Sequence, residues 1–344
     1  MKQLFTLILL LTSIVLTAQD STEVSNGKKF SISGSVDAYF RTNLTGPNEA
    51  FDNGDGPYFL NPGTSFVNRS GFSLGMANAI ISYEGNKVGF VADLVFGPRG
   101  EDAVFLSTGS NNIINQLYIY YNVNVNVKLI LGNFNTFLGY EVISPVGNFN
   151  YSTSYMFSNG PFSHSGLKAD IALSEDFSLM LAVMNSTDYT EINLDGSYTF
   201  GAQLGYKDQY LNFIYGNQTG NSDPTFQVDY TGGTDLNDDF FLGINATYND
   251  TDGSGFYGAA LYPQCTISKK LDLGLRAEYF GFHYNQIDSE TVIAATLSAN
   301  YKVDDLTIIP EIRLDSWNGE LYFDNDLEPT KSLASFLVAA IYKF

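Results

Sequence analysis

The chain ends in SLASFLVAAIYKF, from Ser332 to Phe344, and this stretch alternates in character with a period of two. Every second residue from Ala334 to Phe344 is apolar, and the residues between them include Ser335 and Lys343. Because successive side chains of a strand point to opposite faces, the alternation predicts a strand whose faces meet different surroundings. The stretch therefore predicts either the closing strand of a membrane β-barrel or an amphipathic edge strand that happens to end the chain.

The other end of the chain carries an export signal. Lys2 is followed by the apolar run LFTLILLLTSIVL and then by Thr17-Ala18-Gln19. This pattern is typical of a secretory signal peptide, so we expect residues 1–18 to be removed and residues 19–29 to form a polar lead-in. The apolar run is short for a membrane-spanning helix and polar residues follow it at once, which disfavours a signal anchor.

The bulk composition fits strands with one face in lipid. Charged residues make up 16% of the chain and aromatic residues 15%, with 23 Tyr and 27 Phe. Ordinary soluble domains contain roughly 25% charged residues. After the signal, the best apolar run is Phe336–Tyr342, which is too short for a helix across a bilayer. The formal net charge of −20 argues against nucleic acid as a partner, and the single cysteine, Cys265, excludes an internal disulfide.

The alternation seen at the end of the chain recurs along its length. It is clear in FSISGSVDAYFR, where Phe30, Ile32 and Val36 share one face and Asp37 and Arg41 the other. Adding the weaker segment Thr225–Thr231 makes the number of strands even. The sixteen predicted strands are 30–41, 71–83 (with a bulge near residues 77–79), 87–96, 112–123, 125–131, 167–173, 177–183, 198–206, 211–215, 225–231, 239–249, 254–264, 271–281, 291–301, 305–315 and 332–344.

Turn lengths and charge placement favour a membrane barrel over an aqueous sandwich. With sixteen strands, short turns such as Lys302–Asp304 fall at one end and longer connections at the other, as in bacterial outer-membrane barrels. The apolar face contains no charge in all but two strands, and a Lys or Arg at the bilayer midplane would cost roughly 2–4 kcal/mol. The sequence therefore predicts an all-β fold, a transmembrane antiparallel up-and-down barrel over residues 30–344.

Inward-facing charges are the candidate functional residues, because a barrel of this size has a water-filled interior. Arg276 and Glu278 lie on one predicted strand, and Glu311, Arg313 and Asp315 lie on the next but one, about 9–10 Å away. We predict that they meet in a charge ladder that either rigidifies the wall or sets up a transverse field for solutes. The pore-lining candidates are Asp37, Arg41, Asp93, Lys168, Asp170, Arg276, Glu278, Glu311, Arg313 and Asp315.

The longest irregular segment, residues 133–164, is the third connection at the long-loop end. Among its residues only Glu141 carries a formal charge, and the rest are mostly Asn, Ser, Tyr and Phe. Two placements follow from the sequence: an inward constriction with aromatic, weakly charged walls, as in general porins, or an external cap.

Catalytic and metal-binding patterns are weak. The two histidines, His164 and His283, lie in or beside loops, and neither has an acid and a nucleophile in a recognisable pattern. Asp250-Thr251-Asp252-Gly253 resembles part of a calcium loop, but Ala259 occupies the position of its closing ligand. We predict no enzyme, no metal and no cofactor.

Several stretches resemble the β-barrel porin family of the OmpL-like type. They are LGNFNTFLGYE (131–141), NFNYSTSYMFSNGPFSHSG (148–166), YGNQ (215–218), GINATY (243–248), LRAEYF (275–280) and PEIRLD (310–315). The resemblance spans about residues 30–344 and implies an outer-membrane barrel of a Gram-negative bacterium. It implies no particular functional residues.

From these patterns we expect a porin that passes small hydrophilic solutes or ions by passive diffusion. The alternatives are a non-conducting barrel that acts as a surface adhesin or anchor, and a barrel enzyme. The expected partners are the outer-membrane bilayer, small hydrophilic solutes and the insertion machinery, since the final strand resembles the one by which such barrels are recognised. A homotrimer is a further expectation.

Overall fold

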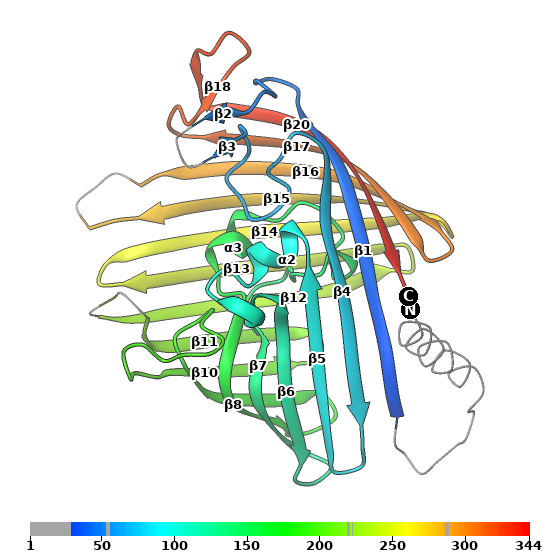
Figure 1. Cartoon of the computed structure of the whole chain (residues 1–344), viewed down its shortest axis with the longest axis vertical. Helices are drawn as coiled ribbons and strands as arrows, with labels where there is room; N and C mark the ends of the chain where they lie inside the picture. Colours follow the sequence, from blue (N-terminus) through cyan, green and yellow to red (C-terminus); the bar gives the residue numbers. More distant parts are fainter. Residues whose placement is uncertain (1–28, 53–55, 219–220, 222, 286–288) are drawn as a thin grey trace, which may run out of the picture.

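Sixteen antiparallel strands close into a barrel, which confirms the predicted fold and strand number (Figure 1). The computed structural model describes residues 29–52, 56–218, 221, 223–285 and 289–344, so the predicted signal peptide lies outside the described residues. The barrel strands are β1 (Lys29–Asn43), β4 (Gly71–Glu84), β5 (Val88–Phe96), β6 (Ile114–Asn122), β7 (Val127–Asn135), β8 (Ser163–Ala172), β9 (Phe177–Met184), β10 (Thr199–Tyr206), β11 (Gln209–Asn217), β12 (Pro224–Asn237), β13 (Phe240–Thr251), β14 (Ser254–Ser268), β15 (Leu271–His283), β16 (Thr291–Val303), β17 (Leu306–Trp317) and β20 (Ser332–Lys343).

The barrel closes where the first and last strands meet. β1 pairs with β20 from Ser35 opposite Lys343 to Asn43 opposite Ser335, and the two strands lie side by side in Figure 1. Backbone bonds in both directions between Gly34 and Phe344, each 3.0 Å, fasten the carboxyl end. The predicted pairing of the closing strand is confirmed. A closed ring leaves no unpaired strand edge, which is the requirement for a sheet in lipid.

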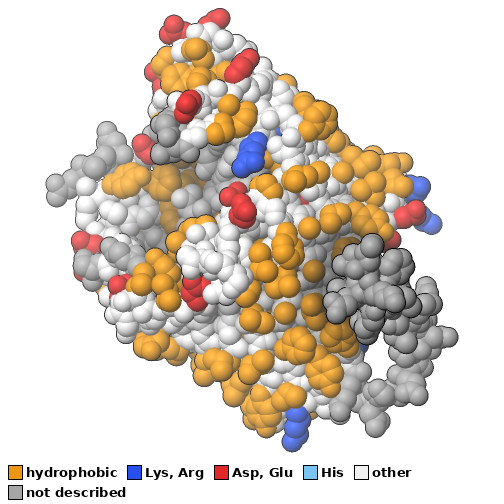
Figure 2. All heavy atoms as spheres, in the orientation of Figure 1, with side chains coloured by type: hydrophobic (Ala, Val, Ile, Leu, Met, Phe, Trp, Pro, Cys, Tyr) orange, Lys and Arg blue, Asp and Glu red, His pale blue; other side chains and the backbone are white. Residues whose placement is uncertain are grey.

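The two faces of the wall differ as the alternation predicts. On β16 and β17 the outward side chains Ile293, Leu297 and Ile312 are 65%, 53% and 52% exposed, whereas the neighbouring inward residues are buried. Hydrophobic side chains cover much of the wall in the face shown in Figure 2. This outward band is the surface that a bilayer would cover.

Connections are short turns at one end of the barrel, which also holds the chain end at Phe344. At the other end they are longer, except for the two-residue turn Asp252–Gly253 between β13 and β14. Small two-stranded sheets lie within the longer connections: β2 (Phe51–Asp52) with β3 (Pro57–Tyr58), and β18 (Tyr322–Phe323) with β19 (Pro329–Thr330). The helices are α2 (Pro98–Ala103) and α3 (Tyr155–Asn159), with 3-10 turns η1 (Gly109–Ile113) and η2 (Pro145–Gly147). In the described parts of the chain, no helix is long and apolar enough to cross a membrane.

Two details differ from the sequence prediction. The expected turn at 232–238 is wrong, because β12 continues to Asn237 and Gly233 pairs with Gly243 of β13. A Cβ at Gly232 would lie 1.9 Å from the side-chain oxygen of Gln209, so a larger residue here would require the end of that flexible side chain to move. The bulge expected near residues 77–79 lies slightly earlier on β4. It faces the stretch of β1 from Val36 to Ala38, where the register between the two strands shifts.

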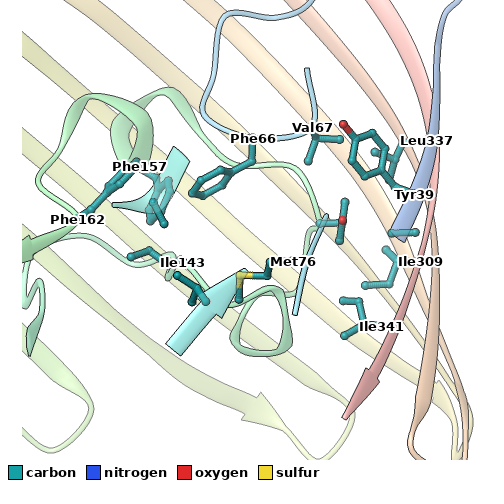
Figure 3. Close-up of a cluster of buried hydrophobic side chains, with 14 of the residues drawn as sticks. Tyr39, Phe66, Val67, Met76, Ile143, Phe157, Phe162, Ile309, Leu337 and Ile341 are labelled. Carbon is teal, nitrogen blue, oxygen red and sulfur yellow. The ribbon is translucent and has the colours of Figure 1, made fainter. Parts of the chain in front are cut away.

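The barrel interior is partly filled by its own connections. Residues 136–162, between β7 and β8 (here the constriction loop), and residues 59–68, between β1 and β4, pack against the inner wall. Figure 3 shows Phe66, Phe157 and Phe162 from these connections and from α3 across from Ile309 and Leu337 on the wall strands. On this side the gap between the 59–68 segment and the wall has a volume of about 10 Å³ and is lined mainly by polar side chains, among them Arg41, Glu311 and Arg313.

Candidate functional site

The constriction loop is held inside the barrel by the charged residues that the sequence singled out. It leaves β7 after Asn135 and returns at Ser163, where β8 begins. Of the ten pore-lining candidates, eight lie 0–7% exposed on the inner faces of β1, β5, β15 and β17. Of the two placements considered for this segment, the structure adopts the inward one.

Glu278 on β15 binds the amino end of α3. Its two carboxylate oxygens accept the backbone N–H groups of Tyr155 at 3.0 Å and Met156 at 2.9 Å. Ser154 completes the cap, because its hydroxyl accepts the N–H of Phe157 at 3.0 Å. The first N–H groups of a helix have no partner within the helix, so a carboxylate placed here satisfies them and favours one position of the loop.

Arg276 on β15 forms the second contact with the loop. Its guanidinium lies 2.6 Å from the Glu141 carboxylate and donates to the Ser152 carbonyl oxygen at 2.6 Å and to the Thr296 hydroxyl at 3.0 Å. Glu141 in turn accepts the N–H of Ser154 at 2.7 Å. Both side chains are buried. Breaking a buried pair of this kind by removing one partner typically costs about 3–5 kcal/mol.

β17 supplies three more charged side chains. Glu311 accepts the N–H of Tyr151 at 3.0 Å and the hydroxyls of Ser152 and Ser298. Arg313 donates to the Thr153 carbonyl oxygen at 2.7 Å and pairs with Asp315 at 2.8 Å. Asp315 also accepts the hydroxyl of Tyr155, a side chain of α3, at 2.9 Å. The predicted ladder residues therefore lie together on one wall, but most of their bonds go to the loop.

The seam strand β1 binds the same loop. Asp37 accepts the Tyr151 hydroxyl and, at 3.1 Å, the N–H of Met76. Burial, together with the Asp37 carboxylate beside it, raises the pKa of Tyr151 well above its usual range, so this hydroxyl stays protonated and donates. Gly75 makes the approach feasible, because a Cβ there would lie 1.6 Å from an Asp37 oxygen. Arg41 donates to the Leu60 carbonyl oxygen at 3.3 Å and so fixes the 59–68 segment instead.

Asp93 stands apart from this group. It lies on β5 and accepts bonds from the amides of Asn78 at 3.1 Å, Asn115 at 2.7 Å and Gln116 at 3.4 Å. All of these partners come from the barrel wall. One strand, β4, separates β5 from the seam strand β1.

Three residues that fix the loop were not among the sequence candidates. Arg99 of α2 donates to the carbonyl oxygens of Ile143 at 2.9 Å and Tyr151 at 3.3 Å. Asp229 of β12 accepts the N–H of Gly139 at 2.9 Å on the opposite side of the lumen. Glu141 was noted only as the charge of the loop. The inward alternation of β12 could have identified Asp229, but Arg99 lies in a connection where no periodicity applies.

On the β7–β11 side the loop packs through apolar contacts. Leu138 is buried in a cluster with Ile130, Met180 and Ile214 from the wall, and Phe137 packs against it. The loop is thus held by polar bonds and by apolar contacts that come from several parts of the wall. Together they hold it in place across the lumen.

Open space remains between the constriction loop and the short turns. A central cavity of about 880 Å³ is lined by residues 136–142 of the loop, by the β10–β11 turn and by β12. A cavity of about 840 Å³ shares Gln203 and Tyr210 with it, and a third of about 520 Å³ shares Tyr140, Asp235 and Phe241. We call the three adjoining cavities the vestibule. The remaining candidates, Lys168 and Asp170, line its 840 Å³ part and pair at 3.4 Å.

The two histidines lie on separate strands, His164 on β8 and His283 on β15. His164 is fully buried, with its Nε2 3.0 Å from the Thr136 hydroxyl and its ring beside Phe137. The nitrogens of His283 face the carbonyl oxygens of Gly253 and Asn249 at 3.3 and 2.9 Å. Among the described residues, no group of three or more His, Cys, Asp or Glu side chains is arranged to hold a metal ion.

A closed barrel with an apolar outer band, a charged interior and an inward third loop defines an outer-membrane channel of the porin type. The family model described as "Putative beta-barrel porin-2, OmpL-like" matches residues 29–344, and the chain belongs to this family. Its place in the family also locates it in the outer membrane. Among curated protein sequences, no relative was found.

Solved structures that resemble this chain include an outer-membrane channel, a porin and an outer-membrane protein. The channel DcaP of Acinetobacter baumannii matches with a TM-score of 0.60 and 13% identity, over 94% of this chain and 99% of that one. An anion-selective porin from Comamonas acidovorans matches with a TM-score of 0.60 and 10% identity, over 92% and 100%. The trimer form of OmpT from Vibrio cholerae matches with a TM-score of 0.55 and 11% identity, over 93% and 100%. At these identities the likeness shows the fold.

Proposed function

We propose that this porin passes small hydrophilic solutes by passive diffusion and that the constriction loop sets the width of the passage. The vestibule supports this most directly, since it provides adjoining space directly beneath the loop, lined by polar as well as apolar side chains. Next to β17 and β20, the gap beside the 59–68 segment has a volume of only about 10 Å³. We therefore assign the route to the side of the lumen lined by β8–β13.

Swelling of liposomes that contain the purified, folded protein tests this function. Neutral sugars from pentoses to trisaccharides would be offered at equal osmolarity. We expect the smallest sugars to enter fastest and the largest to be excluded, because the loop narrows the lumen. Protein-free liposomes are the control. Swelling no faster than this control for every sugar, from barrels shown to be folded, would contradict diffusion.

A second candidate is a non-conducting barrel that serves as a surface anchor or adhesin. The observation that favours it is the filling of the lumen by the constriction loop and the 59–68 segment. The same swelling experiment separates the two functions, because an anchor would be impermeable to every sugar. Catalysis forms no part of the proposal, since neither histidine lies against both an acid and a nucleophile.

We also propose that the barrels associate, and the outer face of β7–β12 is the candidate interface. An apolar groove of about 540 Å³ crosses this face, where Ala169 and Ala202 lie among larger residues such as Leu181 and Phe213. The strands β7–β11 have only 8–10 residues, so this part of the barrel wall is short across the membrane. A wall shorter than the bilayer is thick reduces this mismatch in length by oligomerising. One structural neighbour is described as a trimer. The mass of the protein–detergent particle would establish the number of chains, and a single chain would refute association.

Two proposals concern the ends of the chain. Residues 1–18 act as the cleaved export signal, and the outward aromatic residues of β20, with Phe344 at the end, are read by the outer-membrane insertion machinery. Phe344 is 60% exposed, so its ring is accessible to a partner before the bilayer covers it. Amino-terminal sequencing of the mature protein tests the first proposal.

A further inference from the structure

The vestibule carries opposite charges on two separate parts of its wall. The 840 Å³ cavity is lined by Lys87, Lys128 and Lys168, with Asp170 as its acid. The 520 Å³ cavity is lined by Asp235, Asp238, Asp239 and Asp272, with Lys302 as its base. We name these the basic row and the acidic row. In a chain with a net charge of −20, a concentration of lysines at one position of the lumen is not expected from composition alone.

Strand register places the basic row on one level. The Lys87 carbonyl oxygen accepts the N–H of Asn122, Asn122 is opposite Lys128, and Lys128 is opposite Asp170. Neighbouring strands lie about 4.8 Å apart, so Lys87 and Lys128 are separated by roughly 10 Å along the wall. Lys128 is exposed to the cavity, with its ammonium 5.0 Å from the ring centre of Tyr120.

The acidic row has the same kind of register on another sector. The Asp239 carbonyl oxygen accepts the N–H of Thr266, which lies opposite Asp272. Asp272 pairs with Lys302 at 2.5 Å, whereas Asp235, Asp238 and Asp239 are exposed. The row therefore keeps a negative charge after its ion pair is counted.

The two rows face each other across the mouth of the barrel. The basic row occupies β5–β8 with the turn before β5, and the acidic row occupies β12–β15 with the turn before β13. In a ring of sixteen strands, β12 follows β5 after seven steps, close to the diametrically opposite position. Fixed charges of opposite sign on facing, low-dielectric walls produce a field across the water between them.

We propose that the mouth at the short-turn end of the barrel favours dipolar solutes, those that carry an amine and a carboxylate, over neutral solutes of the same size. The carboxylate is drawn to Lys87 and Lys128 and the amine to Asp235 and Asp239, so the solute aligns across the vestibule. Solutes of a single charge gain on one wall and lose on the other. The inference rests on the proposed diffusion function and names its substrate class.

Isomeric solutes test the inference without a change in size. Alanine and lactamide contain the same atoms, but only alanine is a zwitterion, and β-alanine separates the charges further. In liposome swelling at low salt, we expect alanine to enter roughly threefold faster than lactamide, and β-alanine faster still. A steering field raises the association rate of fully charged solutes by ~10-fold or more, so we expect a smaller increase in the entry rate of a dipole. The preference should disappear near 1 M salt, where the Debye length is about 3 Å.

Variants locate the effect. The double variant Lys87→Glu, Lys128→Glu should bring the alanine-to-lactamide ratio to about 1, and so should Asp235→Asn, Asp239→Asn. Lys331→Glu, an exposed change at the opposite end of the barrel, should leave the ratio unchanged. If lactamide enters and the ratio responds neither to salt nor to these variants, the inference is overturned while diffusion stands. If neither isomer enters, the proposed function itself fails, and the inference with it.

Discussion

Replacing Glu278 with glutamine should loosen the constriction loop without changing the barrel. The substitution conserves shape, so no cavity is created. The glutamate accepts two buried N–H groups, from Tyr155 and Met156, whereas a glutamine side chain has only one oxygen with which to accept. One of the first N–H groups of α3 is then left facing an amide NH₂.

The magnitude follows from these two bonds. A buried N–H left without a partner costs about 1–3 kcal/mol, and the remaining bond weakens because its acceptor is no longer charged. We expect the held position of the loop to lose about 2–4 kcal/mol. At 1.4 kcal/mol for each factor of ten, release of the loop becomes roughly 30- to 700-fold more frequent.

Single-channel recording of Glu278→Gln tests this expectation. Wild-type channels should give steady currents, and the variant should show frequent steps to a larger conductance as the loop leaves the lumen. Glu320→Gln, the same change at an exposed loop position, serves as the control. Identical step frequency in Glu278→Gln and wild type would refute the conclusion that this carboxylate holds the loop.

Three further changes test other parts of the account. Gly75→Ala would place a Cβ 2.6 Å from the Tyr151 hydroxyl oxygen and so disturb the contact of the loop with the wall. We therefore expect chymotrypsin to cleave the loop faster in the folded barrel. The matched control is Gly319→Ala, whose Cβ would meet nothing within 4 Å. Burial raises the pKa of Asp188 from 3.8 to about 6 despite two backbone N–H groups that it accepts, so its contribution to stability is present below pH 3.8 and lost as the pH rises through about 6. The free energy of unfolding of Asp188→Asn should therefore rise relative to that of wild type, by up to about 3 kcal/mol between pH 4 and pH 8. A difference between the two proteins that does not change with pH would contradict this. Phe344→Ala should fold normally in detergent, because Phe344 is bonded to Gly34 through the backbone, but should reach the outer membrane of cells in smaller amounts; equal amounts would argue against recognition of the ring.

The strands and their pairing could be predicted because lipid imposes a strict rule on sequence. Each outward side chain must be apolar, so apolar and polar residues alternate in nearly every strand. Because the number of strands must be even, the weak segment Thr225–Thr231 can then be recognised as a strand. The end of β12 could not be predicted in this way. Gly232 and Gly233 carry a turn signal, whereas in the barrel both continue β12 and pair with Ile244 and Gly243 of β13.

The candidate site was predictable in its members but not in its partners. Alternation places Glu278, Glu311 and Arg313 on the inner face, and strand spacing places them near one another. Their hydrogen bonds go to backbone N–H and carbonyl groups of the constriction loop. Because every sequence has such backbone groups, these bonds produce no recognisable sequence pattern. For the same reason the contribution of Arg99, on a short helix between strands, could be found only from coordinates.

The central claim is that this barrel conducts although its own third loop lies within it. The most direct test is the current through single purified, folded barrels in a planar bilayer. The wild-type barrel should show stable, discrete openings. Their conductance should be smaller than in a variant whose loop is shortened between Ser144 and Gly160. Folded barrels that carry no current, with or without the loop, would contradict it.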